Sequence, residues 1–581
     1  MNDDRPLRRV PASTYRIQVH RGFGFADVRA IVGYLARLGI SDLYLSPYLA
    51  ARPGSTHGYD ICDHSRLNPE LGGEAAYASL LSELAQRDMG HLLDFVPNHM
   101  GIDPASNRWW RDVLENGPSS PFARFFDIDW EPVKQEIRNK VLLPILGDAY
   151  GLVLERGELR LEYAEGALRL RYFDHDLPIN PRSAPRLLRH DVERLKEALG
   201  EDHPSYREFL SIATELQNLP AYTESLAERI AERQREKEVA RERLQRLVDS
   251  ESAVREHLER CIRTFNGTPG DPASFDCLHD LLEAQAYRLA YWRTAFHEIN
   301  YRRFFDINDL AGLRMEEPDV FEATHGLVLR LVREGKITGL RLDHLDGLFD
   351  PLAYLRRLRE SVGPLYVIAE KILSSGERLP DDWPIEGTSG YEFLNELAGV
   401  LVDPTGAKPL RRLYATFTGR TAPFAIVMYV GKKLITQTAL SSELNVLAHA
   451  LNRISEDDRR SRDFTLEALR EALREVVACF PVYRTYVGAG GPREEDRRTI
   501  DQAIERARRR NPAMEPSIFG FLREVLIPDA ERLDPPEVER RLGFAMRFQQ
   551  YTGPVQAKGL EDTAFYRLNV LLSLNEVGGD P

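Results

Sequence analysis

A short segment at residues 339–343 places the strongest constraint on how this chain can fold. It reads Gly-Leu-Arg-Leu-Asp, so that its leucines alternate with Arg341 and Asp343 at the period of a β-strand. Burying an unpaired charge is very costly, so the arginine and the carboxylate each need a partner. Two settings supply one: a structural Arg–Asp pair in the core, or the C-terminal edge of a (β/α)8 barrel, where catalytic groups gather. The segment alone leaves both open.

Strand and helix patterns alternate on either side of this segment. Strands are expected at residues 15–19, 41–45, 91–96, 338–343 and 365–369, and helices at residues 25–38, 80–86, 318–334 and 352–362. Strands that alternate with helices favour a parallel sheet or barrel. We therefore predict an α/β fold, a (β/α)8 TIM-type barrel that carries large helical insertions.

Two long charged stretches interrupt the alternation and set the expected domain boundaries. We expect a first part of the barrel, a mostly helical insertion, a central part with the catalytic strands, a second helical insertion and a return to the barrel, at residues 1–104, 105–310, 311–404, 405–545 and 546–581. Residues 224–263 are densely charged with sparse apolar positions, which predicts an exposed helical hairpin. A solvated helix face explains this charge better than a partner surface.

Composition narrows the classes of partner. The chain has 77 basic and 90 acidic residues and a net charge of -13, which argues against nucleic acid as the main partner. No apolar run reaches the roughly 18 residues of a membrane helix, and the first residues lack the apolar core of a signal peptide. The four cysteines show no C-x-x-C spacing. This pattern predicts a cytoplasmic protein with reduced thiols, without a zinc site.

Polar residues recur where three expected strands end. Asp94 is followed by Asn98 and His99, Arg341 by Asp343, and the next strand ends in Glu370. Asp343 and Glu370 lie one strand–helix–strand step apart, which would bring their carboxyl groups together. Two carboxyls about 5 Å apart form a retaining glycosidase site, with one nucleophile and one acid/base. We expect crowding to raise the pKa of one carboxyl and Arg341 to keep that of Asp343 low.

Each of these residues also has a purely structural explanation when taken alone. Asp94 can cap a loop, and His99 can be a core histidine with satisfied hydrogen bonds. Their joint occurrence at three expected strand ends favours the catalytic interpretation.

These motifs resemble the conserved regions of the α-amylase superfamily (glycoside hydrolase family 13). Residues 94–99 resemble its first region, residues 339–343 its second and Ala369-Glu370 its third. Within the superfamily, the chain is most similar to the family of maltooligosyltrehalose synthases. The resembling stretches run from residue 13 to residue 579 and include residues 54–60, 291–293, 300–310, 479–484 and 558–567.

The resemblance implies an intramolecular transglucosylase that converts the reducing-end α-1,4 linkage of a maltooligosaccharide into an α,α-1,1 linkage. Asp343 would be the nucleophile and Glu370 the acid/base. It also implies no metal or organic cofactor, and a pathway partner, maltooligosyl trehalose trehalohydrolase. Tyr59 would stack on the sugar. The other residues expected to bind substrate are Arg341, Asp94, Asn98, His99 and His344.

The superfamily also uses a third carboxylate, usually in a His-Asp pair on the seventh strand. No such pair occurs late in this chain, and Asp562 is the only late candidate. We expect the chain to end before the barrel is complete, with the third carboxylate beyond Pro581. An α-amylase-type hydrolase, a 4-α-glucanotransferase and an inactive glucan-binding fragment remain as alternatives.

Overall fold

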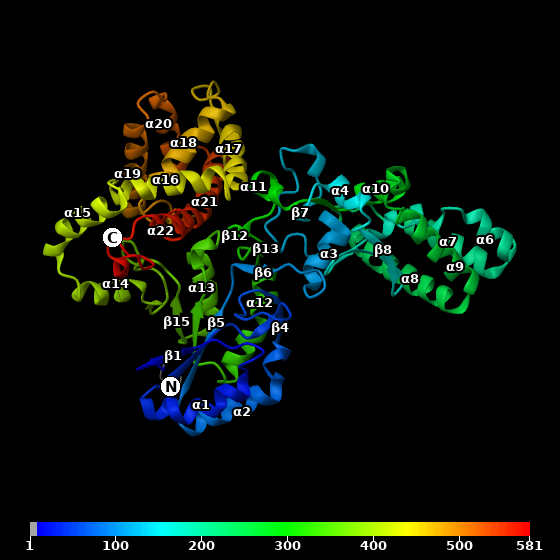
Figure 1. Ribbon diagram of the computed structural model, residues 1–581, viewed down its shortest axis with the longest axis horizontal. Helices are drawn as coiled ribbons and strands as arrows, with labels where there is room; N and C mark the ends of the chain where they lie inside the picture. Colours follow the sequence, from blue (N-terminus) through cyan, green and yellow to red (C-terminus); the bar gives the residue numbers. More distant parts are fainter. Residues whose placement is uncertain (1–8) are drawn as a thin grey trace. The chain divides into compact units, whose positions relative to one another are not determined.

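The computed structural model describes residues 9–581, which belong to two compact units (Figure 1). Among these residues, one unit contains those up to Met100 together with Arg303–Pro581, and the other contains Gly101–Arg302. No helix in the described part of the chain is long and apolar enough to cross a membrane.

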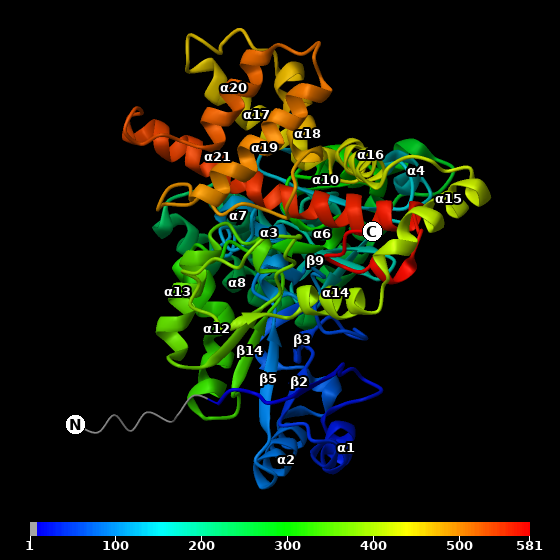
Figure 2. The ribbon, with the colours of Figure 1, turned by 90° about the vertical axis from the view of Figure 1, so that its left-hand side faces the viewer.

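A six-stranded sheet is the centre of the first unit. Its strands are β1 (Thr14–Ile17), β2 (Asp42–Leu45), β5 (Gly90–Phe95), β14 (Gly339–Leu342), β15 (Tyr366–Ala369) and β16 (Gly387–Thr388), in that order. All neighbours are parallel. Figure 2 shows β2, β5 and β14 side by side. The predicted α/β class with parallel strands is confirmed.

Amphipathic helices connect these strands, as parallel strands require. They include α1 (Phe25–Leu38), α2 (Gly73–Gln86), α12 (Pro318–Arg333) and α13 (Pro351–Val362). The Asp27 carboxylate accepts a hydrogen bond from the Gly24 N–H at 2.9 Å and caps α1. Gly39 ends α1 with φ +92°, a conformation that costs glycine little. Smaller antiparallel strands are β3 (Leu49–Ala51) with β4 (Ile61–Leu67), and β6 (His99–Gly101) with β12 (Arg303–Phe304) and β13 (Ile307–Gly312).

A helical bundle follows the sheet in the same unit. It contains α16 (Phe424–Gln437), α17 (Ser441–Glu456), α18 (Leu466–Ala478), α19 (Glu494–Arg510), α20 (Pro516–Leu526) and α21 (Pro535–Gln556). Its apolar faces share one core, which includes Leu444, Leu473, Ile504, Leu522 and Phe548. After α21 the helix widens into a π-helix, η9 (Ala557–Ala564).

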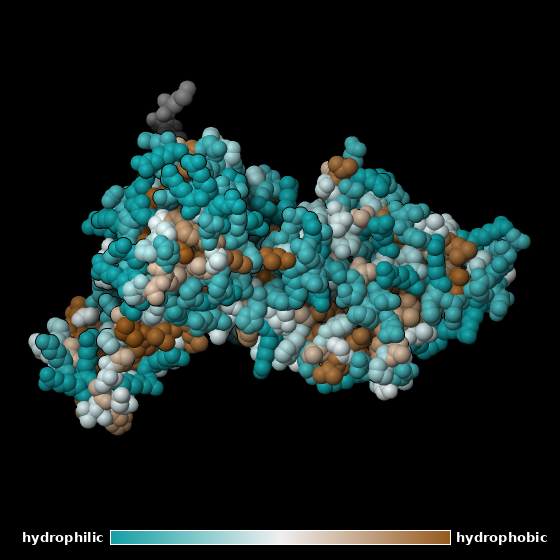
Figure 3. Space-filling model, turned by 90° about the horizontal axis from the view of Figure 1, so that it is seen from above, coloured by the Kyte–Doolittle hydropathy of each residue, from teal (hydrophilic) through white to brown (hydrophobic). Residues whose placement is uncertain are grey.

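No residue of the helices α14 (Tyr391–Val400) and α15 (Ala407–Thr418) is buried. Apolar side chains there face solvent, and Figure 3 shows brown residues gathered at its lower left. The exposed residues are Phe393, Leu394, Leu397, Val400, Leu401, Leu413 and Phe417. An apolar surface of this kind is typical of an interface.

The second unit combines helices with two small sheets. The expected hairpin is formed by α8 (Ala227–Ser250) and α9 (Ser252–Phe265), which pack with α3 (Arg108–Asn116), α6 (Val192–Leu199), α7 (Pro204–Asn218) and α10 (Asp276–Glu283). The insertion also contains strands, although its charged sequence predicted mostly helices. They are the parallel pair β7 (Val141–Leu146) and β11 (Tyr287–Tyr291), and the antiparallel β8 (Arg160–Ala164), β9 (Ala167–Tyr172) and β10 (His175–Pro178).

Candidate active site

The register of three neighbouring strands brings the predicted polar residues together. Arg341 on β14 lies opposite Asp94 on β5. The ladder continues past both strand ends, because the Asp343 N–H donates to Phe95 O and the Glu370 N–H donates to Leu342 O, each at 2.8 Å. The C-terminal ends of the three strands therefore lie at the same level, and the side chains that follow them lie at one edge of the sheet.

Arg341 is the cation that these carboxyls share. Its Nη1 donates to Asp94 Oδ1 at 2.8 Å and to Asp343 Oδ1 at 2.6 Å, and its Nη2 lies 3.2 Å from Glu370 Oε1. Asp343 Oδ2 is buried, and no N–H or hydroxyl of the described residues donates to it. One oxygen of Asp343 is thus held by Arg341, while the other is available to an incoming atom.

Asp343 and Glu370 behave as a coupled pair of carboxyls. Burial and the charge of Glu370 raise the pKa of Asp343 well above its usual range. Burial also acts to raise the pKa of Glu370, but Arg341, His344 and a hydrogen bond with Asp343 lower it overall. The expectation that Arg341 holds the pKa of Asp343 low is therefore wrong. The Arg341 guanidinium is shared with Asp94 and the half-buried Glu370, and the burial of Asp343 beside Glu370 outweighs its effect.

Two tyrosines complete the surroundings of Asp94. Tyr59 and Tyr44 donate to its Oδ2 at 2.6 and 2.9 Å. Asp94 is buried, which raises its pKa despite Arg341 and both hydroxyls. Arg16 donates to the Tyr59 hydroxyl at 3.1 Å. The hydrogen bond to Asp94 fixes the ring of Tyr59, a residue that we expected to stack on a sugar.

The remaining expected substrate-binding residues lie beside this cluster. Asn98 and His99 are fully buried, and the His99 ring packs on Phe304 with centroids 4.2 Å apart. His344 has a left-handed backbone with φ 44°, unusual for a residue other than glycine. This conformation lets its N–H donate to Glu370 Oε2 at 2.9 Å. Backbone strain of this kind is typical of functional sites.

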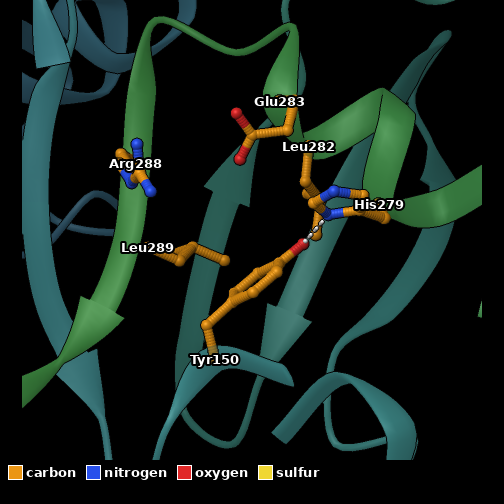
Figure 4. A pocket seen from close by; sticks show the side chains of 6 residues that line it. All are labelled: Tyr150, His279, Leu282, Glu283, Arg288 and Leu289. Atoms are coloured by element: carbon orange, nitrogen blue, oxygen red, sulfur yellow. Dashed lines mark hydrogen bonds between the residues drawn. The ribbon is translucent and has the colours of Figure 1, made fainter. Parts of the chain in front are cut away.

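Two hollows in the second unit contain none of these residues. The first, about 120 Å³, is lined by Tyr150, His279, Leu282, Glu283, Arg288 and Leu289 (Figure 4). Tyr150 Oη lies 3.0 Å from His279 Nδ1. This hollow is smaller than the roughly 300–1,000 Å³ of most ligand pockets. The second is an open groove of about 760 Å³, lined mainly by arginines and glutamates of α3, β9 and α8. No cluster of metal-ligating side chains occurs among residues 9–581.

Comparisons with known proteins agree with this geometry. The family model of the alpha amylase catalytic domain matches residues 26–148. The solved structure of maltooligosyltrehalose synthase from Arthrobacter ramosus has a TM-score of 0.72 and 33% identity, over 98% of this chain and 58% of that one. A Mycobacterium tuberculosis relative, named provisionally as a maltooligosyl trehalose synthase, is 33% identical over 98% of this chain and 58% of its own. The chain belongs to the α-amylase superfamily.

More distant superfamily members match a shorter part of the chain. The intracellular maltogenic amylase of Bacillus subtilis is 34% identical over 137 residues, 23% of this chain and 22% of its own. The synthases match almost all of the chain, including both insertions, although the chain spans only 58% of their length.

Asp562, the late candidate for the superfamily's third carboxylate, is exposed and paired with a lysine. Its side chain is 58% exposed and pairs with Lys558 at 3.0 Å. The neighbouring Glu561 is half-buried and accepts a hydrogen bond from the buried Tyr483.

Sequence reasoning also missed Tyr44, Tyr391 and Glu561. Tyr391 donates to Glu370 Oε1 at 3.5 Å. The available signals were the position of Tyr44 one residue before the end of an expected strand, and the adjacent carboxyls at residues 561 and 562.

Proposed function

We propose that this chain carries the active site of a retaining intramolecular transglucosylase. It converts the reducing-end α-1,4 linkage of maltooligosaccharides into an α,α-1,1 linkage and forms maltooligosyl trehalose. The observation that carries the proposal is the coupled carboxyl pair, Asp343 and Glu370, which Arg341 bridges. Relatives named as synthases of this kind match 98% of the chain, which supports the choice of substrate and product.

The first step cleaves the terminal linkage. Asp343 Oδ2 attacks the anomeric carbon, and the bond from that carbon to the oxygen of the leaving glucose breaks. Glu370 gives its proton to that oxygen. For the attack, Asp343 must be ionised and Glu370 must carry the proton of the carboxyl pair. The pair titrates as one unit, so a small change in its surroundings can move this proton.

The second step joins the released glucose to the enzyme-bound sugar through the anomeric oxygen of the glucose. The glucose turns, its anomeric hydroxyl gives a proton to Glu370, and its oxygen attacks the glucosyl–Asp343 ester. Two inversions give net retention. Tyr59, held by Asp94, orients the sugar, while Asn98, His99 and His344 surround the reacting carbon. A separate hydrolase, a maltooligosyl trehalose trehalohydrolase, would then release trehalose.

The substitution Asp343→Asn tests the assignment of the nucleophile. Asparagine keeps the size of the side chain but cannot form a stable glycosyl ester, so conversion of maltopentaose should fall by about 10³-fold or more. Asp457→Asn removes an exposed carboxyl from the helical bundle and should retain the parent rate. Melting temperatures check that both variants fold.

Product analysis separates the proposed reaction from its rivals. A non-reducing pentasaccharide, with little free glucose, supports the synthase. Accumulating glucose and maltose indicate a hydrolase, and longer and shorter maltooligosaccharides indicate a 4-α-glucanotransferase. If the parent binds maltopentaose without turning it over, the chain by itself is a glucan-binding fragment.

A further inference from the structure

The π-helix η9 gives residue 561 an unusual position. It follows directly from α21 and packs closely on α16. A Cβ on Gly559 would lie 2.7 Å from the Lys432 Cα, and one on Gly431 would lie 2.4 Å from Gly559 O, so both glycines are needed for this approach. Single π-helical turns are rare and occur frequently at functional sites.

The adjacent carboxyls of η9 have different surroundings. Asp562 is exposed and paired with Lys558. Glu561 instead accepts hydrogen bonds from the Tyr483 hydroxyl and the Gly578 N–H. Tyr483 is 5% exposed. The backbone turn that separates the two side chains thus directs only Glu561 inward.

Glu561 is close enough to the catalytic carboxyls to influence them. Its charge and that of Glu370 act on each other and on two tyrosines, Tyr391 and Tyr483. Tyr391 in turn donates to Glu370. Tyr483, whose hydroxyl donates to Glu561, also lies near Lys371, the residue that follows Glu370.

No cation among residues 9–581 pairs with Glu561. Lys371 lies 5.8 Å from the centre of the Tyr483 ring, but it forms ion pairs with Asp346 and Glu377 at 3.2 and 2.9 Å. Burial first, and then the nearby Asp562 and Glu370, raise the pKa of Glu561 to about 7, although Tyr483 and Gly578 oppose this. Glu561 is therefore largely protonated at slightly acidic pH.

We propose that Glu561 is a specificity-determining residue, whose carboxyl group forms a hydrogen bond with the sugar released beside Glu370 and retains it for the second step. This rests on the proposed function. A carboxylic acid offers one donor as well as acceptors, as a sugar hydroxyl does. Its acceptors are used by Tyr483 and Gly578, which leaves the O–H for a ligand. A sugar that stays bound can attack the glucosyl–enzyme before water does.

The proposal predicts a pH dependence of product choice. Glu561 donates below its pKa and loses this donor as the pH rises through about 7. The ionisable groups that face it are Tyr483, Tyr391, Glu370 and Asp562. Burial raises the pKa of Tyr391 to about 12 and that of Tyr483 well above its usual range, so both tyrosines stay protonated between pH 5.5 and 8.5. The ratio of α,α-1,1 product to released glucose should fall above pH 7.

The test compares this ratio in three variants between pH 5.5 and 8.5, with maltopentaose as substrate. Glu561→Gln keeps an N–H donor at every pH, so its ratio should stay high and no longer depend on pH. Glu561→Ala removes the donor, so its ratio should fall about tenfold at pH 6, the effect of one hydrogen bond. Glu539→Gln, an exposed position on α21, should match the parent.

Two results would overturn the proposal. The first is that Glu561→Ala gives the same ratio of α,α-1,1 product to released glucose as the parent. The second is that Asp562→Asn changes this ratio while Glu561→Ala does not. If neither the parent nor any variant forms the α,α-1,1 product, the proposed function is wrong, but the role of Glu561 is still undecided. Glucose binding then decides the role of Glu561, measured by saturation-transfer NMR in an Asp343→Asn background. Binding kept by Glu561→Gln and lost by Glu561→Ala supports the contact, and equal binding in both overturns it.

Discussion

One guanidinium contacts three carboxyls in the active site, of which Asp94 and Asp343 are buried and Glu370 is half-buried. Arg341 contacts Asp94, Asp343 and Glu370. Three negative charges against one positive charge in a buried cluster are unfavourable, so a proton is retained. The two tyrosines on Asp94 stabilise its ionised form. The two carboxyls that must exchange a proton during the reaction are Asp343 and Glu370.

Three buried histidines of the sheet-containing unit make stability depend on pH. Burial lowers the pKa of His64 and His91 to about 4 and that of His325 to about 3. The folded state binds fewer protons than the unfolded one, whose histidines titrate near 6.5, so stability should fall as the pH drops below 6.5. Between pH 7 and 5 each buried histidine costs up to roughly 2 kcal/mol. Glu561 acts in the opposite direction over part of this range.

Urea unfolding of the parent and of His325→Gln isolates one histidine. The parent should lose stability between pH 7 and pH 5. The variant should be less stable at pH 7, because His325 hydrogen-bonds the Tyr354 hydroxyl at 2.9 Å, but it should lose less on acidification. An identical pH dependence in both proteins would contradict a neutral, buried His325.

The sequence predicted individual site residues where a strand pattern carried them. Asp94, Arg341, Asp343 and Glu370 follow period-2 apolar segments, so their common edge could be inferred. Glu561 could not, because its orientation depends on a π-helical turn and on two glycines from separate helices. The sign of the pKa shift of Asp343 also depends on distances within the cluster, which no pattern in the sequence specifies.

At the scale of elements, α8 shows how a charged helix can be a core helix. Arg233 is fully buried and donates to Asn116 Oδ1, Pro220 O and Asn180 Oδ1 at 3.0, 2.6 and 2.9 Å. Arg233→Ala leaves the buried Asn116 Oδ1 and Pro220 O unsatisfied, while Asn180 Oδ1 keeps the Arg182 N–H. The variant should destabilise its unit by about 3 kcal/mol or more. Arg235→Ala, exposed on the same helix, should change stability by less than about 0.5 kcal/mol. Chemical denaturation measures both, and equal effects would contradict a structural role for Arg233.

Element boundaries were easiest to predict where caps and apolar spacing agree. The helices α1, α12 and α13 begin and end within about one residue of their expected positions, since a capping carboxylate or a proline marks each start. The strands of the second unit were missed because they are short and charged on one face. Arg169 and Arg171 on β9, for example, alternate with buried leucines in a segment otherwise dominated by helix-forming residues.

At the scale of the molecule, each unit has its own buried core, so calorimetry should resolve at least two unfolding transitions. Maltopentaose bound to Asp343→Asn should raise only the transition of the unit that contains Arg341 and Glu370, by mass action on its folded state. Arg233→Ala should lower a different transition, that of residues 101–302. The two perturbations together assign the peaks without separating the units. A single transition that both perturbations shift would mean that the units unfold as one cooperative body, despite their separate cores.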